Sequence, residues 1–486
     1  MSVKKNIFYS VALNVLSVLF PIVTAPYISR VLGVDNIGII RFTSTYVGYF
    51  ALFAALGIGY YGVRELAKYK DDQEKCSRLF SSLFFITFCS TLVVTLVFLL
   101  TINTVPSLRE YRLLLSVAGI SLYIVPVTMD WYFQAKENFR IITIRSFVVK
   151  MLALISIFIF VRERNDILPY ILIATFSIVG TQLWNLSYAY KTGLRIDLRN
   201  LELRRHLKPM FVFLWSTVAI GVYVMIDTVM LGFLSTFEQV GYYTSPNLVL
   251  SMITGACMAI NTVLLPRLSH NREQEDEVAN TALLQKAFDL NSLFIVPITT
   301  GAFLVASRFV PLFFGGEFAG CIVPMQIMSL KVILWVLNNF FVLNVLFVFG
   351  LEKKFLLVAT CTALLSFAFN WLLIPRFGAI GTAIVSIAIG GLFQIGYNLF
   401  FVYKRTNIRL RWNALGLAIL LSLSFFVVYY ICDKFISHDV LFLSIFIPLS
   451  IIAYIALQLL AKNYLARQMW CYAMNKLKIN IRHHGT

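Results

Sequence analysis

Fourteen stretches of the chain are long and apolar enough to cross a lipid bilayer as helices. A spanning helix needs about 20 mostly apolar residues, because each residue advances it by about 1.5 Å through a hydrocarbon layer about 30 Å thick. Backbone amides in hydrocarbon must be paired within their own segment, which excludes the shorter, alternating strands of a barrel. The predicted spans are residues 8–29, 38–62, 80–101, 113–134, 143–161, 168–190, 209–234, 240–264, 289–314, 321–349, 355–374, 378–403, 413–432 and 440–461.

The charged residues are too few for a surface in contact with water. Of the 486 residues, 13% are charged and 59% are hydrophobic, whereas soluble domains carry about 25% charged residues. A soluble enzyme, a disordered chain and a secreted disulfide scaffold are therefore excluded. The seven cysteines form no CxxC pair and no P-loop pattern occurs, so we predict no metal site, no cofactor and no ATPase.

One stretch, Gly57-Ile-Gly59-Tyr-Tyr-Gly62, matches the GxGxxG pattern of dinucleotide-binding sites. Such a site needs a preceding strand and a following helix, whereas this stretch ends a predicted span. Close packing of helices at small residues explains it better.

Membrane insertion explains most of the positive charge. The chain has 41 Lys and Arg against 23 Asp and Glu, a net charge of +18. With both termini in the cytoplasm, most basic residues fall in inner segments, as the positive-inside rule requires. The main inner clusters are 64–78, 191–208, 404–411 and the tail after residue 462. Nucleic acid is not needed to explain this charge, and we predict no nucleic-acid partner.

Six cations lie within or at the ends of predicted spans. A cation at the bilayer centre costs at least about 2.5 kcal/mol unless it faces a polar cavity. Lys331 lies about ten residues into its span, near mid-bilayer, which favours a cavity that binds an anion. Arg30 and Arg308 are near enough to a surface to reach headgroups instead. Arg145 and Lys150 are either vestibule contacts or interface anchors. The candidate cationic set is Arg30, Arg41, Lys331, Arg308, Lys150 and Arg145.

Two further sets of polar residues are candidates. Asp227 lies within the span 209–234, and carboxylates inside spans often belong to ion relays, so it is either an ion-coupling site or a structural partner for a cation. A second group lies at the inner end of the span 113–134. Its members cap the membrane interface, which Trp favours, or form a gate or hydrogen bonds between helices. The group is Asp130, Trp131, Gln134 and Glu137.

Two pairs of similar segments suggest a parallel repeat. Residues 32–38 resemble residues 231–242, and residues 133–139 resemble residues 349–355, each pair being offset by about six spans. Parallel repeats are common in transporters, although chance similarity between apolar segments is the alternative. We predict two lobes in the same orientation, residues 1–208 and 209–405. Residues 406–486 then hold two added spans and a basic cytoplasmic tail.

Several of these stretches carry a resemblance to a known family. The matching residues are 26–33 with Gly38, 56–58, 62–67, 130–137, Asp227, 231–232, 240–243, 265–269, 313–315, 370–375 and 377–383. The Asp-Trp-x-x-Gln segment at 130–134 is the most specific, although Ala135 stands where the family commonly has Gly. Across residues 1–405 the chain resembles the Wzx-type O-antigen or capsule repeat-unit flippases of the multidrug/oligosaccharidyl-lipid/polysaccharide exporter superfamily. Twelve spans are usual in that family.

The resemblance implies an all-α membrane protein with two six-helix lobes around a central cavity. It also implies a substrate, a glycan repeat unit on undecaprenyl diphosphate that moves from the inner to the outer leaflet of the bacterial cytoplasmic membrane. A diphosphate is an anion, so the cationic set is expected to line the cavity. Without an ATPase motif, an H⁺ or Na⁺ gradient or the membrane potential is the expected drive. Membrane lipids and a glycan polymerase machinery are the expected partners.

Two other classes of function stay open. A cation-coupled drug or metabolite antiporter of the same superfamily would carry a soluble substrate and need fewer cations at membrane depth. A polytopic glycosyltransferase or ligase would build its active site on a large external loop. The predicted outer loops have about ten residues or fewer, which disfavours the enzyme.

Overall fold

The computed structural model describes residues 3–199, 201–273, 277–406 and 408–471, and all regular elements in these ranges are helices. The prediction of an all-α membrane protein is confirmed. Most of the predicted basic tail, residues 472–486, lies outside the described ranges. The chain divides into two compact units: Met1–Thr244 with Phe367–Ala379, and Ser245–Ser366 with Ile380–Thr486. The predicted lobes, residues 1–208 and 209–405, are based on the sequence repeat, whereas these units are defined by compactness. The lobe boundaries therefore stay a prediction.

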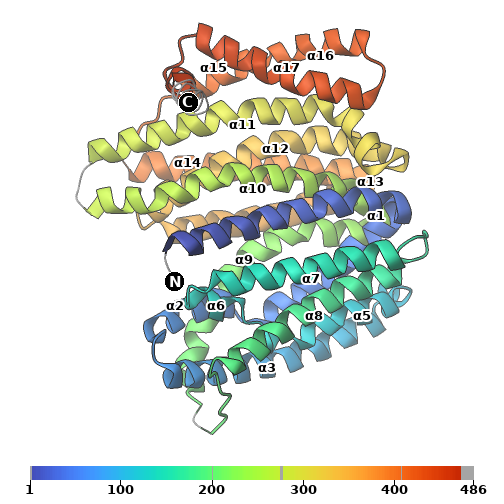
Figure 1. The fold of residues 1–486 in the computed structure, drawn as a ribbon, viewed down its shortest axis with the longest axis vertical. Helices are drawn as coiled ribbons and strands as arrows, with labels where there is room; N and C mark the ends of the chain where they lie inside the picture. The colour runs from blue at the N-terminus through green and yellow to red at the C-terminus, as the bar shows by residue number, and fades with distance from the viewer. Residues whose placement is uncertain (1–2, 200, 274–276, 407, 472–486) are drawn as a thin grey trace, which may run out of the picture. The chain divides into compact units, whose positions relative to one another are not determined.

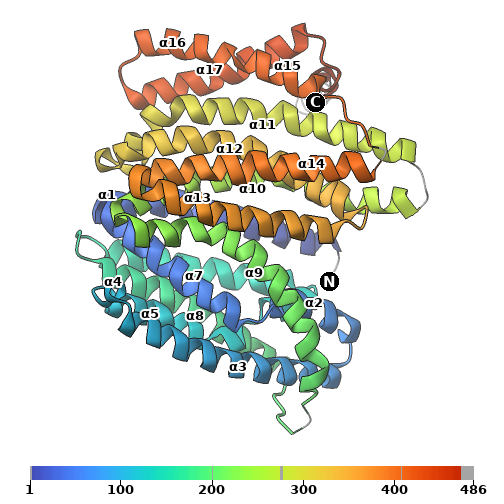
Figure 2. The same cartoon turned by 180° about the vertical axis from the view of Figure 1, so that it is seen from behind.

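The first unit is built around a long N-terminal helix. In both views α3, α5, α7 and α8 run alongside one another in this unit (Figures 1 and 2). Its helices are α1 (Val3–Ala54), α2 (Ile58–Leu66), η1 (Ala67–Tyr69), α3 (Gln73–Thr104), α4 (Pro106–Arg109), α5 (Arg112–Tyr123), η2 (Val125–Val127), α6 (Asp130–Ala135), α7 (Phe139–Phe160), α8 (Ile167–Lys191), α9 (Leu203–Leu234), the beginning of α10 (Phe237–Glu273) and the part of α13 (Glu352–Ile387) from Phe367 to Ala379.

The second unit ends in a layer of three helices beside α11, which both views show (Figures 1 and 2). This layer corresponds to the last two predicted spans. Two short π-helical segments, η4 and η5, interrupt the helices of this unit, and such segments are frequent at functional sites. Its elements after α10 are α11 (Glu277–Phe314), η3 (Gly316–Cys321), α12 (Ile322–Phe341), η4 (Val342–Phe347), α13 (Glu352–Ile387), η5 (Ala388–Phe393), α14 (Gln394–Arg405), α15 (Asn413–Ser422), α16 (Ser424–Phe435) and α17 (Asp439–Leu460).

Ten helical segments of the described chain are long and apolar enough to cross a membrane. Two of these segments, Ala12–Ala54 and Glu352–Arg405, have 43 and 54 residues, about twice the length that a crossing needs. Each contains a glycine in the left-handed region, Gly33 with φ 78° and Gly378 with φ 50°, where one helix ends and another begins. The predicted count of fourteen spans stays a prediction.

Two of the segments that suggested a repeat pack against each other in the first unit. A Cβ atom on Gly38 would overlap the carbonyl oxygen of Phe237, and a Cβ atom on Gly241 would lie 2.5 Å from the carbonyl oxygen of Val34. The contact is therefore reciprocal, because each segment presents a glycine to the backbone of the other. The ring of Phe42 covers the contact, 5.3 Å from the ring of Phe237. Only glycine permits this approach of two backbones.

Candidate functional site

The six candidate cations are divided between the two units. Arg30 and Arg41 lie on α1, on opposite sides of the break at Gly33; Arg30 is exposed and Arg41 is half-buried. Lys150 on α7 donates a hydrogen bond to Ser17 Oγ on α1 at 3.1 Å. These residues belong to the first unit, as does Arg145, whereas Arg308 and Lys331 belong to the second.

Arg145 is buried and has a carboxylate partner. Its side chain is 4% exposed, and its Nη1 lies 3.0 Å from Oδ1 of Asp130, at the beginning of α6. The same nitrogen donates to the side-chain oxygen of Asn185 on α8. Asn185 in turn donates to Asp130 at 3.3 Å and to Gln182 at 3.1 Å. This network joins α6, α7 and α8, and the carboxylate neutralises the Arg145 charge locally.

Arg308 is also held by carboxylates. In the second unit its Nη2 lies 2.8 Å from Oδ1 of Asp433, at the end of α16, and its Nη1 lies 2.8 Å from Oδ1 of Asp439, at the beginning of α17. The guanidinium also lies over the ring of Phe442, 5.3 Å from its centroid. One arginine on α11 therefore fixes the turn between α16 and α17. Lys331 is half-buried on α12, with its ammonium 5.1 Å from the centroid of the Trp335 ring.

Asp227 lies at a junction of three helices in the first unit. Its Oδ2 accepts a hydrogen bond from the hydroxyl of Tyr243 on α10, and its Oδ1 accepts one from the amide of Asn370 on α13, both at 2.7 Å. The residues are 8%, 3% and 0% exposed, respectively. The side-chain oxygen of Asn370 has no hydrogen-bond partner within the described residues. The junction thus holds a carboxylate beside a buried amide oxygen, and carboxylates within membrane spans often belong to ion relays.

Of the four candidate residues at 130–137, two contact other helices and two are exposed. Asp130 joins the Arg145 network, and Trp131 is buried, with its ring stacked on Phe80 at 6.0 Å. Gln134 and Glu137 are exposed. The burial of Trp131 favours contact between helices over a role at the membrane interface.

The GxGxxG stretch has a packing explanation as well. A Cβ atom on Gly62 would lie 2.5 Å from the Trp131 ring, and Gly57 has φ 73° and a backbone neighbour in Phe213. Two of its three glycines are therefore required by close contacts within the first unit.

We expect Asp130→Asn to destabilise the protein, because it leaves the buried Arg145 guanidinium without a counter-charge. Breaking a buried ion pair costs about 3–5 kcal/mol, and roughly half of that is expected because the Asp130 side chain is 44% exposed. The measurement is the thermal unfolding midpoint in detergent. Glu137→Gln, an exposed carboxylate of the same motif, is the control and should leave the midpoint unchanged. Equal midpoints for both variants would contradict the role of the network.

Sequence reasoning missed a chain of buried asparagines in the second unit. Asn291 on α11 donates to Asn261 on α10 at 2.8 Å, and Asn261 donates to Asn339 on α12 at 3.1 Å. Nearby on α12, Asn338 accepts from Asn398 on α14 at 2.7 Å. Interhelical hydrogen bonds of this kind hold membrane helices together. The signal was an asparagine in each of four apolar stretches, which is unfavourable in hydrocarbon unless it is paired.

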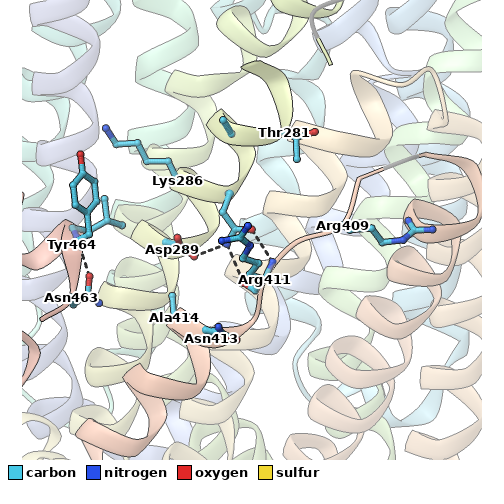
Figure 3. A pocket seen from close by; sticks show the side chains of 12 residues that line it. Thr281, Lys286, Asp289, Arg409, Arg411, Asn413, Ala414, Asn463 and Tyr464 are labelled. Atoms are coloured by element: carbon cyan, nitrogen blue, oxygen red, sulfur yellow. Dashed lines mark hydrogen bonds between the residues drawn. The ribbon is translucent and has the colours of Figure 1, made fainter. Parts of the chain in front are cut away.

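Sequence reasoning also missed a hollow in the second unit, where the beginning of α11 meets the segment before α15 and the residues after α17 (Figure 3). Its volume is about 910 Å³. Two of its basic residues, Arg409 and Arg411, belong to the cluster 404–411, which membrane topology alone explained. Within the described ranges, no cluster of three or more His, Cys, Asp or Glu side chains is arranged to hold a metal ion.

Comparison with known proteins finds relatives along most of the chain. The model of the family described as polysaccharide biosynthesis protein matches residues 3–272. A protein of Escherichia coli K12, provisionally named an O-antigen transporter, is 25% identical over 415 residues, which cover 84% of this chain and 98% of that protein. A Shigella dysenteriae protein with the same provisional name is 22% identical over 272 residues, which cover 55% of this chain and 67% of that protein.

Two solved structures share the fold. The lipid II flippase MurJ in an inward closed conformation superposes with a TM-score of 0.79 at 14% identity, covering 94% of this chain and 100% of that one. An inward-facing multidrug resistance transporter of the MATE family superposes with a TM-score of 0.61 at 15% identity, covering 82% of this chain and 97% of that one. At these identities the likeness extends to the fold alone.

Proposed function

Because the chain belongs to the polysaccharide biosynthesis protein family, we propose that it is a transporter that moves a lipid-linked glycan between the leaflets of a membrane. The observation that carries this proposal is the relative from Escherichia coli K12, which is matched over 98% of its length and is named for O-antigen transport. The fold shared with a lipid II flippase supports it. The names of these proteins favour transport over the glycosyltransferase or ligase alternative.

The finer proposal concerns the substrate and its direction. The substrate is an O-antigen or capsule repeat unit on undecaprenyl diphosphate, which moves by alternating access from the inner to the outer leaflet of the bacterial cytoplasmic membrane. Both termini are cytoplasmic in this proposal, and the basic inner segments support that orientation. A complex with the glycan polymerase machinery is a further part of the proposal.

The contacts of the six cations narrow the set that would bind a diphosphate. Arg145 and Arg308 each have a carboxylate within 3.0 Å, so their charges are already balanced inside the protein. Both are better assigned to joining helices. As contacts of the anionic substrate we propose Arg30, Arg41 and Lys331, with Lys150 as an additional candidate, because a cation within or at the end of an apolar span is costly unless it faces a polar cavity.

A complementation experiment tests this cationic set. A strain that lacks its own flippase would be given Arg41→Ala or Lys331→Ala, and surface glycan and membrane protein level would both be measured. We expect at least about a tenfold loss of surface glycan at a normal protein level, because each change removes one charge-assisted contact to the diphosphate. Lys434→Ala, an exposed lysine at the end of α16, is the control. Normal surface glycan in both test strains would refute the cationic set.

The antiporter alternative differs in its substrate. Vesicles that contain the purified protein and a labelled lipid-linked glycan would report transfer of the label between leaflets. The flippase proposal expects transfer that depends on the protein, whereas a soluble-substrate antiporter would give none. The ion that drives transport is proposed to act at Asp227, a buried carboxylate that accepts hydrogen bonds from the Tyr243 hydroxyl and the Asn370 amide.

A further inference from the structure

The hollow in the second unit is bordered by three elements that lie far apart in the sequence. Its walls come from the first turns of α11, from the segment before α15 and from the residues that follow α17 (Figure 3). Its lining combines three cations, one carboxylate, uncharged polar groups and small apolar side chains. The lining residues on which the argument depends are Gln285, Lys286, Asp289, Arg409, Arg411 and Asn463.

Polar contacts hold the walls of this hollow in place. Gln285 on α11 accepts a hydrogen bond from the backbone N–H of Arg411 at 2.8 Å and donates to the carbonyl oxygen of the same residue at 3.0 Å. Its amide also donates to Asp289 at 2.8 Å. On the opposite wall, Asn463 accepts from the N–H of Leu465 at 3.0 Å and donates to Gln458 at 2.9 Å. These hydrogen bonds tie α11 to the segment before α15 and fix the residues that follow α17.

The charge of the lining is positive. Lys286 and Arg411 are exposed, and Asp289 is the one carboxylate among the lining residues. Arg409 lies apart from them in Figure 3, and its guanidinium donates to the carbonyl oxygens of Tyr403, Thr406 and Ile408. Lys286 and Arg411 are thus the cations best placed to contact an anion.

The hollow lies at the ends of apolar helices, where a membrane surface is expected. Apolar helical segments that could span a bilayer, Ala279–Phe314, Asn413–Phe435 and Asp439–Leu460, all have one end at this hollow. Trp412 lies beside it, with its ring 5.0 Å from Phe288 and its Nε1 donating to the Tyr403 hydroxyl at 3.2 Å. Trp and Tyr concentrate at the headgroup level of a bilayer.

We propose that this hollow binds the phosphate headgroup of an anionic phospholipid, with Lys286 and Arg411 as the cationic contacts. Basic pockets between spanning helices at a membrane surface are suited to such headgroups. Acyl chains would continue along the apolar faces of the neighbouring helices, where Leu420 on α15 is 63% exposed and Ile452 on α17 is 64% exposed. Free phosphate shares the headgroup chemistry but makes no use of these apolar faces. A bound lipid would connect α11 with α15 and α17.

The test measures binding to the purified full-length chain in a neutral detergent. Phosphatidylglycerol, phosphatidylcholine and inorganic phosphate would be titrated separately, with the thermal unfolding midpoint and the apparent Kd as readouts. We expect phosphatidylglycerol to raise the midpoint and the other two to leave it unchanged. In the double variant Lys286→Gln with Arg411→Gln, the apparent Kd for phosphatidylglycerol should rise about 25-fold, or about fivefold for each cation.

Two further variants distinguish binding in the hollow from a general attraction of anionic lipid to the positive surface. Asp289→Asn removes the only negative charge of the lining and should tighten binding of phosphatidylglycerol, a change that a merely structural role would not produce. Lys404→Gln with Lys462→Gln removes two exposed cations that do not line the hollow, and it should weaken binding less than twofold.

Three results would overturn the proposal. The first is the absence of any response to phosphatidylglycerol in the wild-type chain. The second is an equal response to inorganic phosphate, which would identify a site for small anions instead of a lipid. The third is an equal loss of binding in the two double variants, which would reduce the effect to surface charge. The unfolding midpoints of all variants without lipid would show that each is folded.

Discussion

Replacing Asp227 with Asn is expected to abolish gradient-driven transport while folded protein stays at the wild-type level. Asparagine has the shape of aspartate, and its amide can still exchange hydrogen bonds with Tyr243 and Asn370. Only the negative charge is lost, and with it the ability to bind and release a cation. Transfer of labelled lipid-linked glycan between the leaflets of vesicles with an imposed H⁺ or Na⁺ gradient would fall to the level of vesicles without protein.

A second variant at the same junction tests whether the carboxylate itself, and not one of its hydrogen bonds, is required for transport. Tyr243→Phe removes one hydrogen bond to Asp227 but keeps the carboxylate, so transport should persist, with at most a shift in its dependence on ion concentration. If folded Asp227→Asn protein transports at the wild-type rate, Asp227 is not the coupling site. If instead the variant fails to fold, Asp227 has the structural role that the sequence analysis left open.

Alanine at Gly38 or Gly241 is expected to destabilise the first unit severely. Each new Cβ atom would meet the backbone of the opposite segment, at Phe237 or at Val34, and a backbone cannot move aside as a side chain can. Overpacking of this kind costs about 1–3 kcal/mol and at times more, and we expect the upper end. The yield of folded protein and the thermal midpoint should both fall for each variant.

The matched control lies on the same helix as Gly241. A Cβ atom on Gly255, also on α10, would meet nothing within 4 Å. Gly255→Ala should therefore leave stability unchanged or raise it by up to about 1 kcal/mol, since alanine is the better helix former. If all three variants had the same yield and midpoint, the close contact between the two segments would not be needed for folding.

The helical fold class and the family resemblance were accessible from the sequence, and both are confirmed. The number of spans stays a prediction, because two of the ten long apolar segments of the described chain each contain a break. These breaks, at Gly33 and Gly378, lie where the sequence prediction ends one span and begins the next.

The candidate cations show more clearly what could not be predicted from the sequence. Arg145 and Arg308 were identified because each lies within or beside a predicted span, which is a local property of the sequence. Their partners could not be predicted from hydropathy. Asp433 is 125 residues from Arg308 along the chain, and Asp130, the partner of Arg145, lies on a different helix, α6. The same applies to Trp131, whose neighbour Phe80 comes from α3.

The sequence by itself determined that this chain is a helical membrane protein and showed its resemblance to a family of polysaccharide biosynthesis, because hydropathy and short motifs are local properties that can be recognised without the fold. Only the tertiary structure decided which charges are already neutralised and which residues surround Asp227. It also brought Lys286 and Arg411 to one hollow from elements more than a hundred residues apart. Electrostatic energy depends on the distances between such residues, and packing of the helices sets those distances.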